Sequence, residues 1–543
     1  MRLHVAHMDN HRQEPLFKAM ACPDFYPHPV RYVRQKDTHI SKIFLTGEYV
    51  YKIKKPVNLG FLDFSSLAKR HRYCELEVTL NRRLTDQVYL GVIPITYADN
   101  RYRLSGSGRE VEFAVCMRQL PDACSLASLL EQDRITVEQI ETLASILTDF
   151  YVQQGSAALK LAAASWKNIK TSCEENFSQT RWAVGNPLDA ELYRAVRSAM
   201  VSFLTRRKAL FDNRSESGKI YHGHGDLRSG HIYFTGKNRI QIIDCIEFNS
   251  SLRNIDIASD LAFLTMDLDF RGAPGLGSVL LDIYVRKTRD WQVYALMPFY
   301  KCYRAMVRCK VNCFRLKENH GSANDPGALH RRANRYLSYA HTYAEQFDRP
   351  IIWVLCGLPA AGKSSIAGIL SKQLMITTLR SDVIRKQLFG QIQKKRTATR
   401  LEQDIYSPAA DRLTYAELLR LARNALDLKE SIILDATFSK PEYRRQVLEL
   451  ANELRCRAVF VECTAPDKVL KARLLQREGT ASVSDARHHH FEMLKQKYVS
   501  MDEIDQKLRL QIDTTRPIHD CVHAILAWDY RVSCMPVENG DDR

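Results

Sequence analysis

Residues 357–364 carry the clearest chemical signature in the chain. They read GLPAAGKS, which matches the phosphate-loop pattern GxxxxGK[ST]. An apolar run precedes them at 351–356 and a helical run, SSIAGILSKQL, follows, so the loop has the strand–loop–helix context that the pattern requires. Its glycines let backbone N–H groups surround phosphate oxygens, and the start of the helix adds positive potential. The predicted nucleotide-binding residues are Gly357, Leu358, Pro359, Ala360, Ala361, Gly362, Lys363, Ser364 and Ser365.

Two side chains of this loop and one distant carboxylate predict a magnesium nucleotide. Lys363 is expected to bridge the β- and γ-phosphates of ATP, and Ser364 to hold Mg²⁺. Asp435 ends the apolar run SIILD, where a second carboxylate would orient Mg²⁺ and its water. ATP and Mg²⁺ are therefore the predicted cofactors.

A short polar segment after the second predicted strand of this region supplies a candidate base. In LRSDVIRK, Asp382 lies at a strand end, where it would take a proton from a substrate hydroxyl. Arg385, one helical turn further, would reach an acceptor phosphate or the transferring group. The alternative is a plain helix cap at Ser381 or Asp382, with the basic residues facing solvent.

Two arginines further along are candidates for a lid. Arg473 and Arg477 are four residues apart, so they share one face of a predicted helix. In a mobile segment over the phosphates they would neutralise charge in the transition state. We therefore expect both to bind nucleotide.

A second constellation lies in the first half of the chain. The segment HGDLRSGH, 224–231, is followed by a strand pattern that ends in Asp244. An HxD flanked by strands, then an aspartate at the end of the next strand, is the layout of a protein-kinase-like catalytic centre. Asp226 would orient or deprotonate the acceptor hydroxyl, and Asp244 would hold Mg²⁺ against the phosphates.

A lysine and a glutamate upstream are the expected partners of that centre. Lys52 lies on an early strand and would bind the α- and β-phosphates, and Glu77, on the following helix, would pair with it. Lys54 and Glu75 are the rival residues. Strand parity does not separate the two lysines, because residues two apart point to the same face.

The C-terminal motifs together resemble a known family. Residues 351–515 resemble the small P-loop kinases of the polynucleotide kinase, gluconate kinase and zeta-toxin group. The resemblance is closest to the bacteriophage-type polynucleotide kinase pattern, in which an Asp–x–x–Arg element follows the phosphate loop. The resemblance implies a five-stranded parallel sheet and ATP- and Mg²⁺-dependent phosphoryl transfer to a hydroxyl. It places the strand-end aspartate at Asp435 and the lid arginines at Arg473 and Arg477.

The N-terminal motifs resemble a different family. Residues 25–345 are similar to the aminoglycoside phosphotransferase and choline kinase-like branch of the kinase fold, in which the loop reads HGDxxxxN. His231 stands where that branch has an asparagine that binds Mg²⁺, so the resemblance makes His231 a candidate metal ligand beside Asp244. A hard cation prefers oxygen to imidazole nitrogen. The whole chain looks like a bacterial fusion of the two kinase types.

The elements that must position these residues fall into two patterns. The first half has a small strand-rich part followed by helices, which predicts an α+β fold. The second half alternates strands and helices, which predicts a parallel sheet with helices on both faces. Its expected strands are 351–356, 375–379, 431–435, 457–463 and 508–513. Pro350 follows a long helical pattern, so we predict domains at 1–349 and 350–543.

Composition narrows the setting of the protein. The 543 residues include 14 cysteines, none in a CxxC pair, and the start lacks a secretory pattern, so we predict a cytoplasmic protein with reduced thiols. The apolar runs are too short to span a bilayer, so no membrane association is expected. The net charge is +17, with nine basic and three acidic residues in 301–345. That stretch is a solvated helix face or a site for an anionic ligand.

These observations predict a two-domain, ATP-dependent phosphotransferase. The acceptor is a hydroxyl on a small molecule or on a nucleic-acid end, with the small molecule favoured; the sequence indicates no stable protein partner. The alternative is a nucleotide-binding regulatory protein whose N-terminal half does not turn over substrate. The reason for this alternative is His231, which replaces the expected asparagine.

Overall fold

The computed structural model describes residues 10–60, 62–153, 165–236, 238–318, 325–390, 407–478 and 488–534. Its contacts divide the chain into two compact units. One unit combines Met1–Asn168 with Arg214–Tyr284, and the other combines Ile169–Asn213 with Val285–Arg543. The second unit therefore includes helices that precede residue 350, and the domain boundary at 349–350 stays a prediction.

The first unit opens with a six-stranded antiparallel sheet in the order β1-β2-β3-β6-β4-β5. Its strands are β1 (Arg34–Asp37), β2 (Ser41–Leu45), β3 (Tyr49–Lys54), β4 (Tyr89–Ala98), β5 (Arg101–Leu104) and β6 (Arg109–Arg118). Helices α1 (Asn10–Met20) and α2 (Leu67–Asn81) supply apolar residues to two core clusters that involve this sheet. Ser66 caps α2, because its side chain accepts a hydrogen bond from the Lys69 N–H.

The rest of this unit is helical, with two small antiparallel sheets, β8–β9 and β7–β10. Its strands are β7 (Ile220–His222), β8 (Ile232–Gly236), β9 (Arg239–Ile242) and β10 (Asn254–Asp256). Its helices are α3 (Leu126–Glu131), α4 (Val137–Val152) and α8 (Ile257–Phe270), and α5 (Ser165–Thr180), α7 (Lys208–Glu216) and α9 (Pro274–Thr288) continue into the second unit. Every residue of α8 is buried, so even its aspartates must find partners inside the protein.

The second unit holds a five-stranded, all-parallel sheet in the order β12-β13-β11-β14-β15. Its strands are β11 (Ile351–Cys356), β12 (Thr377–Arg380), β13 (Ile432–Asp435), β14 (Arg457–Thr464) and β15 (Arg509–Asp513). Five of the six residues of β11 are buried, because a central parallel strand is covered on both faces. The parallel sheet predicted from the sequence is confirmed, with strand ends shifted by one or two residues.

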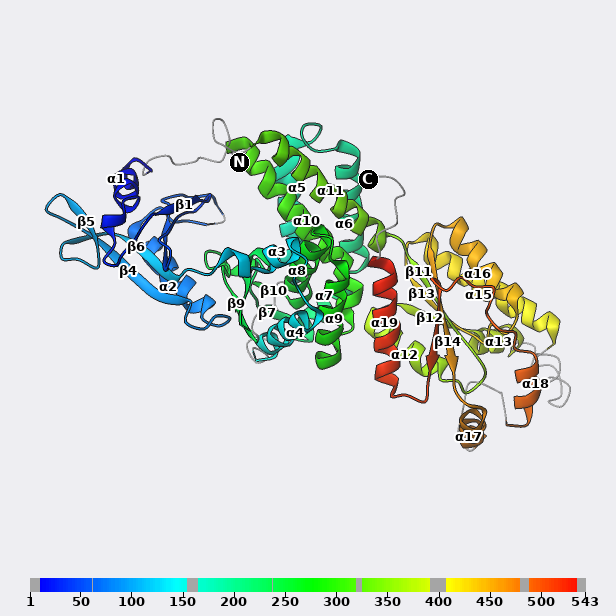
Figure 1. The fold of residues 1–543 in the computed structure, drawn as a ribbon. Coiled ribbons are helices and arrows are strands. Elements are labelled where there is room, and N and C mark those ends of the chain that lie inside the picture. The colour runs from blue at the N-terminus through cyan, green and yellow to red at the C-terminus, as the bar shows by residue number, and fades with distance from the viewer. Residues whose placement is uncertain are drawn as a thin grey trace. The chain divides into compact units, whose positions relative to one another are not determined.

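Helices cover both faces of this sheet, with α12 and α19 on one side and α15 and α16 on the other (Figure 1). The helices of this part are α12 (Lys363–Leu374), α13 (Ser381–Gly390), α15 (Pro408–Asp427), α16 (Pro441–Glu453), α17 (Asp467–Glu478), α18 (Phe491–Gln496) and α19 (Ile518–Cys534). The unit also contains α6 (Ala190–Arg206), α10 (Gln292–Glu318) and α11 (Pro326–Asp348). In the described part of the chain, no helix has both the length and the hydrophobicity needed to cross a membrane.

Candidate functional site

The phosphate loop needs glycine at two positions because of its backbone path. Gly357 has φ +126° and Gly362 has φ +87°, both in the region that L side chains rarely adopt. A Cβ on Gly357 would lie 2.3 Å from the carbonyl oxygen of Cys463 in β14. Gly362 is the N-cap of α12, so the loop leads directly into a helix N-terminus. With this geometry the backbone N–H groups of the loop can donate hydrogen bonds to anionic oxygens.

Lys363 is buried and folds over the loop that precedes it. Its Nζ donates hydrogen bonds to the carbonyl oxygens of Gly357, at 2.9 Å, and Leu358, at 2.8 Å. Burial lowers the pKa of Lys363, while the carboxylates of Asp435 and Asp382 raise it by a smaller amount. The lysine is therefore positioned at the loop and electrostatically linked to both predicted carboxylates.

A hydroxyl and a carboxylate meet beside the loop. The Ser364 Oγ donates to the Oδ2 of Asp435 at 2.6 Å, and Asp435 is buried at the carboxyl end of β13. Both groups offer oxygen ligands, which is the donor chemistry that Mg²⁺ prefers, so these residues fit that cation. The two residues predicted as magnesium ligands from the sequence are therefore adjacent.

Arg380, which the sequence analysis did not single out, joins this pair. Its Nε donates to Asp435 Oδ2 at 3.2 Å, and its Nη2 lies 3.3 Å from the Ser364 Oγ. The residue ends β12, and the strand register places it directly beside Asp435. The feature of the sequence that could have identified Arg380 is its position at a strand end, two residues before Asp382.

Asp382 and Arg385 lie on α13, where the sequence placed them after a strand. Asp382 is in the first turn of the helix, close enough to influence the pKa of Lys363. Arg385 is buried and its Nη2 donates to the Oδ1 of Asp411 in α15 at 2.7 Å. The roles of these residues as base and phosphate-binding group stay predictions.

Arg473 connects α17 to the phosphate loop. Its Nη1 donates to the carbonyl oxygen of Ala360 at 3.3 Å and to the Thr514 Oγ1 at 3.0 Å, and its Nη2 donates to the Thr514 carbonyl oxygen at 2.7 Å. The side chain of Arg477 lies outside the described residues.

A cavity of about 500 Å³ adjoins Arg473. It is lined by Ala360, Gly362, Ser365, Ile366, Arg473, Gln476, Thr514, Thr515, Arg516, Ile518 and Cys521. The 514–521 side of the cavity was not predicted, because no sequence motif marks it.

The HGD loop of the first unit, residues 224–226, is hydrogen-bonded to α8. The carboxylate of Asp260 accepts hydrogen bonds from the N–H groups of His224, at 2.7 Å, and Gly225, at 3.0 Å. It also accepts one from the Tyr151 hydroxyl at 3.0 Å. Because Asp260 is fully buried, these bonds replace the water that a carboxylate needs.

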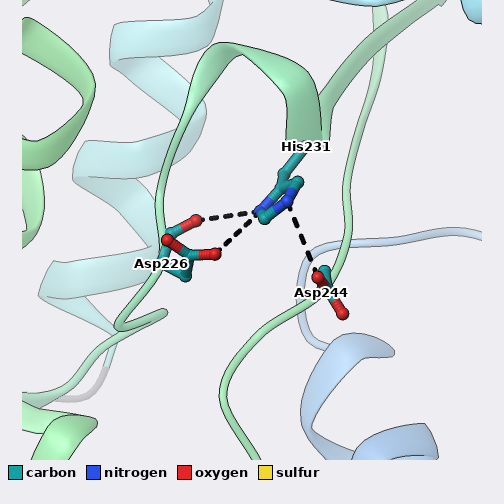
Figure 2. A group of neighbouring side chains, drawn as sticks. All are labelled: Asp226, His231 and Asp244. Atoms are coloured by element: carbon teal, nitrogen blue, oxygen red, sulfur yellow. Dashed lines mark hydrogen bonds and ion pairs between the residues drawn. The ribbon is translucent and has the colours of Figure 1, made fainter. Parts of the chain in front are cut away.

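Asp226, His231 and Asp244 form a cluster at the end of this loop (Figure 2). Their ligand atoms lie within 4.8 Å of one another, and the His231 ring is 3.6 Å from a carboxylate oxygen of each aspartate. Burial and the nearby Arg228 lower the pKa of His231 to about 4, so the imidazole is neutral. Burial alone would raise the pKa of Asp244, but Lys52 and His231 hold it below its ordinary value.

Arg228 occupies both oxygens of the candidate base. Its Nε donates to Asp226 Oδ1 at 2.7 Å and its Nη2 to Asp226 Oδ2 at 2.8 Å. The same Nη2 is 2.9 Å from the Nε2 of His231. This arginine lies within the HGDLRSGH segment, but the residue pattern predicts no role for it.

Lys52 connects this cluster to α2. Its Nζ donates to Glu77 Oε1 and to Asp244 Oδ1, each at 2.8 Å. Lys54 points to the same face, as strand parity requires, and donates to Glu77 Oε2 at 2.7 Å and to Glu247. Glu75 is exposed. The structure therefore brings Lys52, Glu77 and Asp244 together, and Glu247 is a partner that the sequence analysis missed.

Comparisons with known proteins find similarity in sequence and in structure. A protein-family model described as an AAA domain matches residues 352–500. An uncharacterized protein of Mycobacterium tuberculosis is 29% identical over 465 residues, which cover 84% of this chain and 90% of that protein.

Two solved structures are similar to parts of this chain. A putative aminoglycoside phosphotransferase from Ralstonia eutropha is 13% identical with a TM-score of 0.36, over 62% of this chain and 98% of its own. A gluconokinase from Sinorhizobium meliloti is 16% identical with a TM-score of 0.25, over 34% of this chain and 94% of its own. The family-model match and the five-stranded parallel sheet agree with the C-terminal P-loop fold predicted from the sequence.

Proposed function

We propose that the protein is an ATP- and Mg²⁺-dependent phosphotransferase that transfers the γ-phosphate of ATP to a hydroxyl group. The observation that carries this proposal is the contact of Ser364 with Asp435 beside the phosphate loop, within reach of the buried Lys363. In this arrangement the lysine can neutralise the charge of the nucleotide's phosphates, and the hydroxyl and the carboxylate can bind its metal ion.

The residues of this site divide the work of phosphoryl transfer. The loop N–H groups and Lys363 bind the phosphates, and Ser364 and Asp435 hold Mg²⁺, which neutralises phosphate charge when bound. Asp382 orients the acceptor hydroxyl and accepts its proton. Arg473, already hydrogen-bonded to the loop, adds positive charge at the cavity where the nucleoside part of ATP would lie.

The acceptor is a small molecule or a nucleic-acid end, with the small molecule preferred, and the protein acts in the cytoplasm. The basic stretch 301–345 motivates the nucleic-acid version. Binding of an oligonucleotide that weakens steeply with added salt would support that version, because released counterions make such binding salt-dependent.

A second candidate function has its own observation. Arg228 holds both carboxylate oxygens of Asp226, so the group that would accept a proton in the N-terminal site is already paired. This favours a nucleotide-binding regulatory half that does not turn over. In that case the C-terminal site alone is the enzyme.

ATP turnover by the full chain separates these functions. We would compare the wild type with Lys363→Ala and Asp226→Ala across sugars, nucleosides and 5′-hydroxyl oligonucleotides, with Lys372→Ala, an exposed lysine on the same helix, as the matched control. Loss of turnover in Lys363→Ala alone supports a C-terminal enzyme with a regulatory half. Loss of a different product in each variant supports two kinases. ATP binding without turnover on any acceptor would overturn the proposal.

A further inference from the structure

The Asp226–His231–Asp244 cluster has a donor set that differs from that of the phosphate-loop site. Two carboxylates and one imidazole present one ligand atom each, all within 4.8 Å of one another. Ligands around one cation are at most about 4–5 Å apart when the metal–ligand bonds are about 2.0–2.6 Å long. The three side chains are therefore close enough to share a single ion (Figure 2).

Hydrogen bonding fixes the tautomer of His231. A guanidinium only donates, so the Arg228 Nη2 at 2.9 Å makes His231 Nε2 the acceptor. The proton is then on Nδ1, which donates to the backbone carbonyl oxygen of Asp226 at 3.0 Å. A histidine whose Nδ1–H is bound to a carbonyl presents its Nε2 lone pair as a metal ligand, in a fixed orientation. That lone pair lies on the side of Asp244, whose Oδ2 is 3.6 Å from Nε2.

This donor set does not fit Mg²⁺ well. Magnesium is a hard cation that takes oxygen ligands and keeps several waters, whereas imidazole nitrogen suits first-row transition metals. A single nitrogen among carboxylate oxygens therefore shifts the preference of the site away from Mg²⁺. The order of transition-metal affinities puts Mn²⁺ at its weak end, so Mn²⁺ is a conservative probe of that shift.

We propose that the Asp226–His231–Asp244 cluster binds a divalent first-row transition-metal ion in preference to Mg²⁺, with the His231 Nε2 as its nitrogen ligand. Arg228 holds this nitrogen until the cation displaces it. The guanidinium and the cation compete for the same lone pair and for the Asp226 carboxylate, so Arg228 lowers the affinity of the site, as does Lys52 through its hydrogen bond to Asp244 Oδ1. The proposal goes beyond phosphoryl transfer at the phosphate loop and does not depend on it.

Mn²⁺ binding to the full chain without nucleotide tests the proposal. Free Mn²⁺ is counted by electron paramagnetic resonance during titration, and Mg²⁺ is added as competitor. We expect Mn²⁺ to bind at least ten times more tightly than Mg²⁺. The bound ion should show electron spin-echo modulation from one ¹⁴N nucleus, because the serine and aspartate of the phosphate-loop site offer only oxygen. Equal affinities, no binding, or bound Mn²⁺ without nitrogen coupling would each overturn the proposal.

Variants locate the ion. His231→Asn should abolish the nitrogen coupling and weaken Mn²⁺ binding about tenfold, without weakening Mg²⁺ binding. His71→Asn, at a histidine on the surface of α2, should change neither. Arg228→Gln should tighten Mn²⁺ binding several-fold, and unchanged or weaker binding would contradict the competition. The wild-type measurement decides the proposal even if a variant fails to fold.

Mn²⁺ binding and turnover report on different sites. Asp435→Asn should leave the nitrogen-coupled Mn²⁺ signal intact. A chain that lacks ATP turnover yet binds Mn²⁺ as expected would overturn the proposed function and support the metal site. A chain that turns over ATP without a nitrogen-coupled Mn²⁺ signal would support the proposed function and overturn the metal site.

Discussion

Gly357 and Gly368 lie on either side of the phosphate-loop lysine in very different surroundings. We expect Gly357→Ala to weaken ATP binding at least tenfold and to lower stability by about 2–3 kcal/mol, because its φ of +126° is strained for alanine. The added Cβ would also meet the Cys463 carbonyl oxygen at 2.3 Å. Isothermal titration with ATP and thermal melting measure the two effects.

Gly368→Ala is the matched control, since a Cβ there meets nothing within 4 Å and the residue is inside α12. It should leave ATP affinity unchanged and raise helix stability by about 0.5–1 kcal/mol. Equal ATP affinity in the two variants would mean that the loop path is not needed for binding.

Asp435 is the carboxylate that we propose as a ligand of Mg²⁺. Asp435→Asn keeps the side-chain shape but removes the charge that faces Ser364 and Arg380. We expect the Mg²⁺ concentration for half-maximal turnover to rise about tenfold, because one anionic ligand is lost. Steady-state turnover across a Mg²⁺ series measures this. Asp427→Asn, at an exposed position of α15, should leave that concentration unchanged; a parallel change would exclude a specific role for Asp435.

At the level of elements, α8 positions the HGD loop through one carboxylate. Asp260→Ala leaves the N–H groups of His224 and Gly225 and the Tyr151 hydroxyl without their acceptor. We expect a loss of about 3 kcal/mol, since each buried unsatisfied donor costs about 1–3 kcal/mol and the loop relaxes in part. Hydrogen exchange should accelerate in 223–226.

The control for this loop is Asp86→Ala, whose exposed ion pair with Arg239 contributes less than about 1 kcal/mol. It should leave exchange in 223–226 unchanged. Slow exchange in the Asp260→Ala protein would show that the loop is held by other contacts.

Helix α10 contains a lysine that we expect to destabilise the fold at neutral pH. Burial lowers the pKa of Lys310 from 10.5 to about 8, and Glu175 offsets this only in part. Between about pH 8 and 10.5 the unfolded chain binds more protons at this residue, so its contribution to stability rises with pH across that window. Below pH 8 the penalty is complete.

Lys310→Met should therefore raise the melting temperature at pH 7, by an amount equivalent to about 2 kcal/mol, and the gain should shrink toward pH 10. Thermal melting of both proteins over this pH range measures the effect. Lys317→Met, at an exposed position of the same helix, should show no such pH-dependent gain. A gain that is constant with pH would assign the effect to packing alone.

At the scale of the whole molecule, helices that precede residue 350 support the P-loop region. Gln292 donates to the Gln373 carbonyl oxygen at 3.1 Å, and Arg207 donates to the Leu374 carbonyl oxygen, so both bind the C-terminal end of α12. The Trp291 ring stacks on His519 of α19, with ring centroids 5.3 Å apart. These contacts lie within one compact unit.

We therefore expect a fragment of residues 350–543 to be less stable than the same region in the full chain. Hydrogen exchange should be faster in α12 and α19 of the fragment, because the carbonyl oxygens and rings named above lose their partners. The β13 strand, which takes no part in the contacts named above, provides the internal reference. Equal protection of α12 and α19 in both proteins would support 349–350 as an independent domain boundary.

The sequence alone determined what depends on nearby residues. The phosphate loop, its flanking strand and helix, and the parallel sheet follow from periodicity and from glycines within one short stretch. The predicted pair Lys52 and Glu77 is in hydrogen-bond contact, since the alternating faces of a strand and the turns of a helix limit the candidates, and its role at a nucleotide stays a prediction. Strand parity, however, left Lys54 equivalent, and only the contact of Lys52 with Asp244 separates the two lysines.

Only the tertiary structure decided which distant residues meet. Arg380 beside Asp435 depends on strand register, and the Asp260 carboxylate under the HGD loop depends on how α8 packs. Arg228 and Asp226 are only two residues apart in the sequence. The residue pattern does not predict, however, that the Arg228 side chain turns toward Asp226 and donates hydrogen bonds to it. The grouping of helices with the P-loop region is also long-range. Local motifs follow from backbone chemistry, whereas these contacts follow from the packing of the whole chain.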